Sequence, residues 1–127
     1  MAYAGIQQTF TLVAAADLSG AQYALVRASA AGLTNIASLS TNSALVGVLQ
    51  NKPLSGQAAT VADFGLSKVI AGASATVNTY FTNDSSGRAV AAQSGDMIIG
   101  RFLEAPGAGG DIVTARLMPP VRMFGAA

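Results

Sequence analysis

Alternation of apolar and polar residues is the main signal along this chain, and its period in most clear segments is two. The clearest stretch begins with an apolar run over 44–50 and continues, after a polar segment around Pro53 and Gly56, into a second run over 58–70. Proline fixes its φ angle and glycine accepts a positive φ, so the polar segment is expected to turn the chain. The two runs therefore predict a β-hairpin with a loop of medium length.

The second of these runs also carries a change of phase. Phe64 and Leu66 fall on one of its faces, and Asp63 and Ser67 fall on the other. The alternation breaks immediately after Ser67. A slip of one residue moves every later side chain to the opposite face, which predicts a bulge or bend near Ser67, as a small barrel needs at a corner.

Similar short runs, separated by turn residues, occupy most of the remaining chain. Asn83 and Asp84 open the strongest turn signal, which ends at Gly87, and Pro119-Pro120 is expected to end the last strand because proline cannot donate to a ladder. Further strands are expected over 8–14, 22–27, 33–39, 76–82, 88–91, 96–104 and 111–118. Eight or nine short strands with hardly any helical pattern predict an all-β single domain, a barrel or a sandwich.

Three segments follow from this pattern. Residues 1–8 have no clear period and are expected to form an extended N-terminal arm, residues 9–120 to form the β-barrel or sandwich, and residues 121–127 to form a C-terminal tail. The arm contains Tyr3 and Ile6, which have no obvious destination within the chain.

A weak internal repeat is visible in the spacing of glycine and proline. Gly47, Pro53 and Gly56 are spaced like Gly100, Pro106 and Gly109, and the segment 20–32 parallels 75–87. Each half would then consist of a strand, a turn, a strand and a hairpin with a long loop, although chance spacing also explains the match because both residues are common here.

Composition narrows the possible functions. Only 10% of the 127 residues are charged and the formal net charge is +1, so the chain lacks the basic field that direct nucleic-acid binding needs. So weakly charged a surface suits a protein that is packed against neighbours. The N-terminus has no basic region before an apolar core, and the uncharged stretch 28–51 is too polar for a membrane span, so we expect a soluble protein made in the cytoplasm without membrane partners.

Candidate catalytic and metal-binding chemistry is scarce. There is no Cys or His, which excludes Ser-His-Asp and Cys-His arrangements, disulfides and the usual structural zinc sites. The carboxylates are Asp17, Asp63, Asp84, Asp96, Glu104 and Asp111. Five lie in or beside expected turns, where Asp commonly accepts backbone hydrogen bonds, and Asp63 points outward from a strand. We therefore expect no catalytic residues, no metal site and no cofactor.

A series of short motifs runs across residues 9–119. They are Val46-Gly47-Val48-Leu49-Gln50-Asn51-Lys52-Pro53, Gly56, Ala59-Thr60-Val61, Gly65, Lys68-Val69, Asp84, Gly87-Arg88-Ala89-Val90, Gly100-Arg101, Leu103-Glu104 and Gly110-Asp111-Ile112-Val113. In this order the motifs resemble the capsid decoration, or cement, proteins of tailed bacteriophages. The resemblance implies a small β-rich domain, similar to a β-tulip, that forms a trimer on the outer surface of a phage head. There it would contact the major capsid protein where capsid subunits meet and stabilise the shell against internal DNA pressure.

Two sets of residues are candidates for this role. Ala2, Tyr3, Ile6 and Phe10 are expected to bind the capsid by adding an extended segment to a sheet or groove. An equally open alternative is that Tyr3 and Ile6 close one end of the chain's own barrel. The expected oligomer interface comprises Lys52, Pro53, Pro106, Met123 and Phe124.

Other classes remain open. A carbohydrate-binding or other interaction module of a virion or tail would fit a β-sandwich, but three Tyr, five Phe and no Trp offer few aromatic platforms. A domain without any partner also fits the composition, and a small enzyme would need two carboxylates that converge in a pocket.

Overall fold

The structure of the chain is a computed structural model that describes residues 6–38 and 44–122. Every regular element in these ranges is a β-strand, which confirms the predicted all-β class. The strands are β1 (Gln7–Ala14), β2 (Leu25–Ala30), β3 (Leu33–Ile36), β4 (Leu45–Leu49), β5 (Ala58–Ile70), β6 (Tyr80–Asn83), β7 (Ala89–Ala91), β8 (Met97–Phe102) and β9 (Ile112–Arg122). No helix within the described ranges could reach across a membrane.

The nine strands form one sheet that is closed at its N-terminal end. Its order is β1-β3-β2-β4-β5-β9-β8-β6-β7, and an additional pairing of β1 with β5 closes the first five strands into a barrel. We call this barrel the first unit. The predicted hairpin is present in it, because Leu49 of β4 lies opposite Val61 of β5 in an antiparallel ladder.

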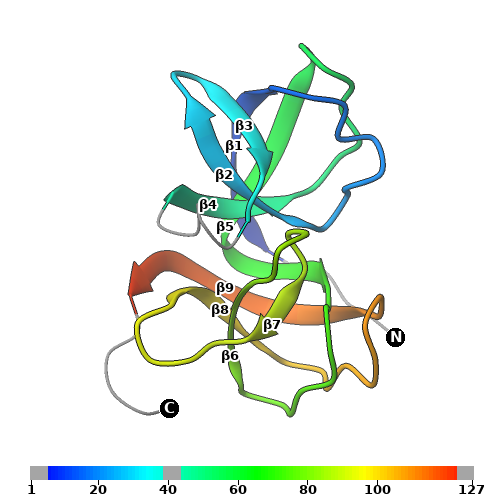
Figure 1. Cartoon of the computed structure of the whole chain (residues 1–127), viewed down its shortest axis with the longest axis vertical. Coiled ribbons are helices and arrows are strands. Elements are labelled where there is room, and N and C mark those ends of the chain that lie inside the picture. The colour runs from blue at the N-terminus through cyan, green and yellow to red at the C-terminus, as the bar shows by residue number, and fades with distance from the viewer. Residues whose placement is uncertain (1–5, 39–43, 123–127) are drawn as a thin grey trace.

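Strand β5 continues beyond the first unit into a second one. Its 13 residues pair with β1 as far as Gly65, and from Gly65 to Ile70 they pair with β9. The second unit consists of this end of β5 with β6, β7, β8 and β9, and a parallel bridge between Ala71 and Ala89 connects its two margins. Figure 1 shows the two units one above the other, with β5 (green) passing between them.

The two units repeat the same hydrogen-bonding pattern, as the glycine and proline spacing predicts. In the first unit Tyr23, at a φ of 71°, donates its N–H to the Leu49 carbonyl at 2.7 Å. In the second, Asn78, at a φ of 70°, donates to the Phe102 carbonyl at 2.7 Å. The parallel pair of Ala14 with Thr34 likewise corresponds to the Ala71–Ala89 bridge.

The repeat in the structure differs by one residue from the repeat seen in the sequence. Gly56 donates to the Ala14 carbonyl, and the equivalent bond to Ala71 comes from Gly110 rather than Gly109. Both donors have a positive φ, 84° for Gly56 and 93° for Gly110. The loop after Pro106 is therefore one residue longer than the loop after Pro53.

Two hydrophobic clusters account for most of the core. One fills the first unit and includes Leu18, Val26, Leu49 and Val61. The other contains interior side chains of the second unit, such as Phe81 and Phe102, whose ring centroids lie 4.9 Å apart. This second cluster also includes Leu25, Val48 and Ala62 of the first unit, so the two units share a continuous core and form one domain.

The predicted bulge near Ser67 is wrong in position. The register of β5 with β9 runs without interruption through Ser67, which is fully buried. The irregularity occurs on the other edge of β5, where Gln8 and Thr9 of β1 pair with Phe64 and Ala62 and skip Asp63. The position of a bulge depends on which strand pairs with the bulged one, and the alternation within a single strand does not identify that partner.

The predicted end of the last strand is also wrong, because β9 passes through Pro119-Pro120 to Arg122. The reason lies in its partners. The ladder with β5 ends at Leu117, and the ladder with β8 shifts register between Ile98 and Gly100 before it resumes at Val121. The prolines occupy this irregular stretch, where no ladder donor is required.

Other strand limits differ by a few residues. The strand expected over 22–27 runs from Leu25 to Ala30, and the one expected over 76–82 begins only at Tyr80. Before Tyr80, the backbone N–H of Thr79 donates to the Thr76 carbonyl and the two hydroxyl groups lie 2.8 Å apart. This local turn replaces the ladder that the β-branched residues favour.

Candidate binding surface

The carboxylates in turns accept hydrogen bonds from their own loops, as predicted. Asp84 Oδ1 accepts from the N–H groups of Ser86 and Arg88, and Asp111 Oδ2 accepts from Gly107 and Ala108. Asp96 Oδ2 accepts from Gln93, also through the backbone. These side chains stabilise turns, and the described ranges hold no group of three or more His, Cys, Asp or Glu that could hold a metal ion.

Hydrogen bonds lower the pKa values of two carboxylates, Asp17 and Glu104. The hydroxyl and the N–H of Ser19 lower the pKa of Asp17. The hydroxyl and the N–H of Thr114, at 2.7 and 2.9 Å from Glu104 Oε1, lower the pKa of Glu104. Asp63 differs, because its Oδ1 is buried without a hydrogen-bond partner at the bulge in β5.

The expected capsid-binding residues are only partly described. Ile6 is 93% exposed and immediately precedes β1, which begins at Gln7 within the range expected to be an arm. Phe10 is half-buried and packs against the core of the first unit. Ala2 and Tyr3 lie outside the described residues, so their role stays a prediction.

The expected interface residues lie in separate loops. Pro53 and Pro106 are buried at equivalent positions of the two units, and their carbonyls accept from Leu18 at 2.9 Å and Ala75 at 3.2 Å. Lys52 is exposed beside Pro53. Met123 and Phe124 lie outside the described residues. The two prolines hold loops against their own chain, and an oligomer contact by any of these residues stays a prediction.

A surface that sequence reasoning did not single out lies on the outer side of the second unit. It is formed by β5, β6, β8 and β9 and contains two adjoining hollows of about 280 and 550 Å3. Both hollows are lined by Phe64, Arg101 and Arg116; the smaller also reaches Tyr80, and the larger also reaches Leu103. Ile6, which precedes β1, lines the larger hollow as well. We call Phe64, Tyr80, Arg101, Leu103 and Arg116 the outer groove.

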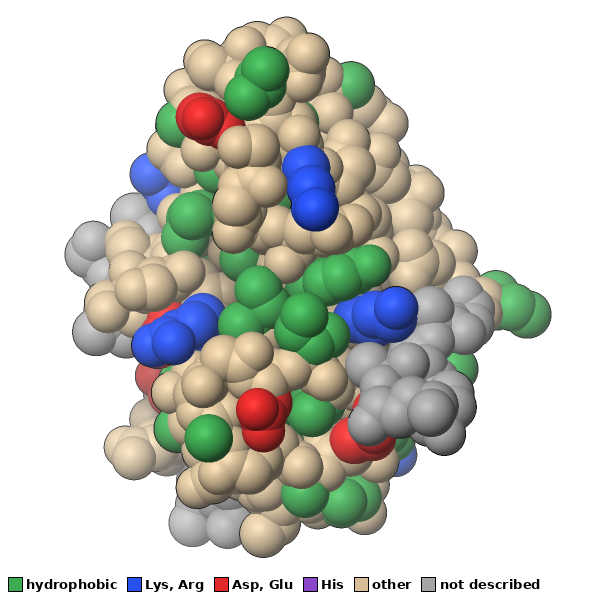
Figure 2. All heavy atoms as spheres, turned by 90° about the vertical axis from the view of Figure 1, so that its right-hand side faces the viewer, with side chains coloured by type: hydrophobic (Ala, Val, Ile, Leu, Met, Phe, Trp, Pro, Cys, Tyr) green, Lys and Arg blue, Asp and Glu red, His purple; other side chains and the backbone are tan. Residues whose placement is uncertain are grey.

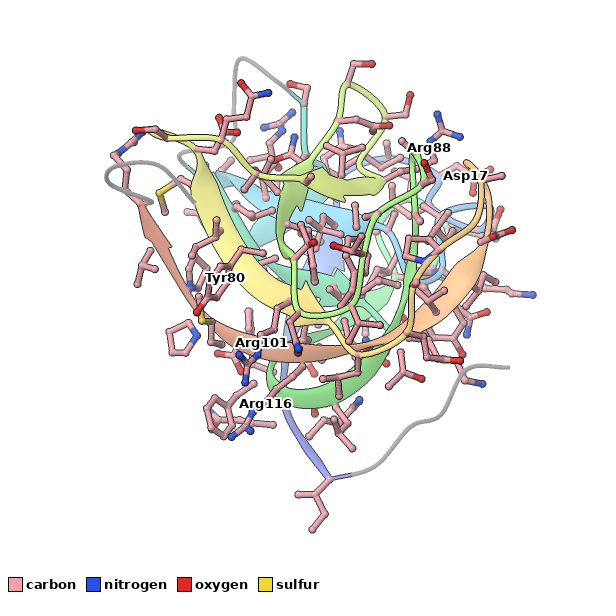
Figure 3. The ribbon with its side chains drawn as sticks, turned by 90° about the horizontal axis from the view of Figure 1, so that it is seen from below. Asp17, Tyr80, Arg88, Arg101 and Arg116 are labelled. Carbon is pink, nitrogen blue, oxygen red and sulfur yellow. The ribbon has the colours of Figure 1, made fainter. Side chains whose placement is uncertain are left out.

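The outer groove is apolar and basic at once. Phe64 is 48% exposed, Tyr80 39% and Leu103 37%. Arg101 and Arg116 are directly opposite each other on β8 and β9, and Figure 3 shows them side by side, away from Arg88 and Asp17. Like charges at directly opposite positions destabilise an antiparallel pair, so this arrangement has a cost in the isolated chain.

Most other basic residues already have a partner in the described part of the chain. Arg88 forms an ion pair with Asp84 at 3.3 Å, Arg122 donates to the Gly95 carbonyl, and Lys68 lies over the ring of Tyr23. Arg27 donates to the Ile36 carbonyl. Arg101 and Arg116 form no such interaction with any described residue. Figure 2 shows scattered charges on another face, where no basic patch gathers.

The sequence does contain a signal for this surface. In β8, Arg101 precedes the buried Phe102, and in β9 Arg116 follows the buried Ala115, so both arginines occupy outward positions of alternating strands. What the alternation cannot reveal is the register that places the two arginines opposite each other, because register depends on the strand pairing.

Comparison with known proteins finds a relative at the level of fold. No protein-family model matches the sequence, and no curated protein matches it. Four solved chains match, among them the head fiber gp8.5 N base of bacteriophage phi29. The two chains are 20% identical, with a TM-score of 0.65, and the alignment covers 91% of this chain and 98% of that one. This likeness shows a shared all-β fold.

Proposed function

We propose that this chain is a structural protein of a bacteriophage virion that binds the outer surface of the assembled capsid. The observation that carries the proposal is the likeness of nearly the whole chain to the base of a phage head fiber. The weak charge of the chain, at 10% charged residues, also supports a role packed against other proteins. The carboxylates held in separate turns favour binding over catalysis, so we propose no enzymatic activity.

Binding to the lattice would stabilise the head by mass action. A protein that binds the assembled shell but not its free subunits adds RT ln(1 + [L]/Kd) to the stability of the shell for each copy bound. An oligomer, which we propose to be a trimer, raises the effective concentration of each further contact once the first has formed. Modest contacts per copy would then resist the pressure of packaged DNA.

Co-sedimentation tests the capsid proposal. Purified protein is mixed with mature heads or with free major capsid subunits, and the pelleted fraction is measured. We expect binding to heads and none to free subunits. Equal pelleting with both, or with neither, would contradict the proposal. Sedimentation equilibrium of the free protein tests the trimer separately, and a monomer mass would contradict that part.

The expected contact of the N-terminal segment has a sharper test than deletion of residues 1–8, because Gln7 and Gln8 pair with β5. Ile6→Ser changes a side chain that is 93% exposed and should leave folding intact. We expect it to weaken head binding by about fivefold or more, as truncation of an apolar anchor does. Leu54→Ser, at 50% exposure in a distant loop, is the matched control. Unchanged binding of the Ile6 variant would contradict this contact.

A further inference from the structure

The repeat gives the outer groove a counterpart in the first unit. In the first unit, Leu25 of β2 lies opposite Val48 of β4, which lies opposite Ala62 of β5. In the second unit, the equivalent positions across three adjacent strands are Tyr80, Arg101 and Arg116, in that order.

The two sets of positions have opposite environments. Leu25, Val48 and Ala62 are each 0% exposed, because the second unit packs on them and they join its core cluster. Tyr80 is 39% exposed, Arg116 is exposed and Arg101 is half-buried, and hollows lie beside them. The first unit thus uses this face to hold a neighbour. On the second unit the described residues leave Tyr80 and Arg116 exposed, and Ile6 lines the larger hollow beside them.

The chemistry of the outer groove defines what would cover it. Exposed apolar side chains of Phe64, Tyr80 and Leu103 gain by leaving water. Arg101 and Arg116 repel each other and have no partner among the described residues, so an anion between them would relieve the repulsion and form charge-assisted hydrogen bonds. A carboxylate matches the planar fork of a guanidinium.

The chain's own acids are poor candidates for this partner. Asp17, Asp84, Asp96, Glu104 and Asp111 already accept hydrogen bonds within their own loops. Asp63, the remaining one, has a buried oxygen. A second copy would have to give up such bonds in order to supply a carboxylate, and this favours a different protein as the occupant.

We infer that the outer groove is a docking surface for a segment of another protein that carries carboxylates between apolar side chains. The arginines hold the carboxylates while Phe64, Tyr80 and Leu103 contact the apolar side chains. The partner's segment would cover the outer groove of the second unit, just as the second unit covers the equivalent positions of the first unit. The inference concerns this surface for any protein partner. Ile6, proposed above to contact the capsid, also lines the larger hollow. Substitution of Arg101 and Arg116, which leaves Ile6 unchanged, therefore distinguishes the two proposals.

The test uses short synthetic peptides in which glutamates flank leucines, with copies that carry glutamine or lysine in place of glutamate. Binding to the full chain is followed by the amide NMR signals of β8 and β9. We expect the glutamate peptide to shift the signals of Arg101 and Arg116 and to bind about tenfold or more tightly than the glutamine copy. The lysine copy should not bind, and added salt should weaken the binding.

Matched variants assign the effect to the two arginines. Arg101→Gln with Arg116→Gln should abolish the preference for glutamate, whereas Arg27→Gln, at a basic residue of β2 in the first unit, should retain it. Unchanged amide signals outside β8 and β9 would show that the variants fold. Equal binding of the glutamate and glutamine peptides, or of the variant and the original chain, would overturn the inference. A loss of self-association on the double substitution would also overturn it, since the occupant would then be a second copy.

Discussion

Gly47 and Gly100 occupy equivalent positions of the two units, where a neighbouring strand passes unusually close. A Cβ atom at Gly47 would collide with the Ala62 carbonyl oxygen and the Val61 side chain, and one at Gly100 would collide with the Arg116 carbonyl oxygen. Backbone atoms cannot move aside as the tip of a side chain can. The requirement for glycine at both sites therefore comes from the approach of the hairpin's second strand to its first.

Gly47→Ala and Gly100→Ala should each destabilise the protein by about 2 kcal/mol, because the added methyl group forces strand β5 or β9 outward. Urea denaturation of the purified variants measures the change. Gly20→Ala is the control, since nothing lies within 4 Å of its Cβ position, and it should stay within about 0.5 kcal/mol of the original chain. A cost for Gly20→Ala as large as for Gly47→Ala would contradict the steric explanation.

Single residues also show the limit of the sequence analysis. The spacing of Gly47 and Pro53 against Gly100 and Pro106 predicts the repeat, because tight approach and fixed φ leave a recognisable residue type. Asp63 leaves no such mark. It lies in the bulge of β5 only because the register of β1 with β5 skips it. The residue type of Asp63 does not indicate how the two strands pair, so the bulge could not be predicted from it.

At the scale of elements, the hairpin of β8 and β9 is held at its loop by Glu104. The carboxylate accepts from both the hydroxyl and the N–H of Thr114, ten residues further along the chain. These bonds need the ionised form, and they hold the pKa of Glu104 below its ordinary value. The equivalent hairpin of β4 and β5 uses Asn51, which bonds Thr60 N–H and the Ala58 carbonyl and does not titrate in this range.

The stability of the second hairpin should therefore depend on pH. Since the folded-state pKa of Glu104 is lower than the unfolded one, its contribution is present at neutral pH and is lost as the pH falls from the unfolded value through the folded one. Stability measured by urea denaturation between neutral pH and acid should fall less steeply for Glu104→Gln than for the original chain. Asn51→Ala, which removes the uncharged hydrogen bonds to Ala58 and Thr60, should lower stability without changing how steeply stability depends on pH. Parallel curves for Glu104→Gln and the original chain would contradict this role.

The hydrophobic pattern predicts pairing between strands that are contiguous in sequence, but not pairing between distant strands. The hairpin over 44–70 was predictable because both of its strands and its turn are contiguous in sequence. The parallel pair of β1 with β3 and the division of β5 between two units were not, since they depend on contacts between distant segments. The outer groove escaped prediction for the same reason, as Phe64, Tyr80, Arg101 and Arg116 come from four strands and Leu103 follows β8.

At the scale of the whole molecule, the two units are related by repetition but not by surface chemistry. Val48 and Arg101 occupy the same position, one within the shared core and the other in the outer groove. A substitution tolerated in one unit should therefore be damaging in the other.

Val48→Arg should destabilise the protein by about 3–5 kcal/mol, because it places an unpaired charge in the core between the units. Arg101→Val should be neutral within about 0.5 kcal/mol, since it removes a charge that has no partner among the described residues. Thermal or urea unfolding of the two variants tests the asymmetry. Similar costs for the two substitutions would mean that the outer groove is already covered within the chain.

The continuity of β5 has a mechanical consequence. One strand is the last of the first unit and the first of the second, so a pull on either unit passes to the other along covalent bonds. An interface between two units that was held only by side-chain contacts would separate at its weakest point under such a load. Here, stretching must first break the hydrogen-bond ladders that β5 forms with β1 and with β9. Force spectroscopy should accordingly record a single rupture for the chain, without a separate early event for either unit.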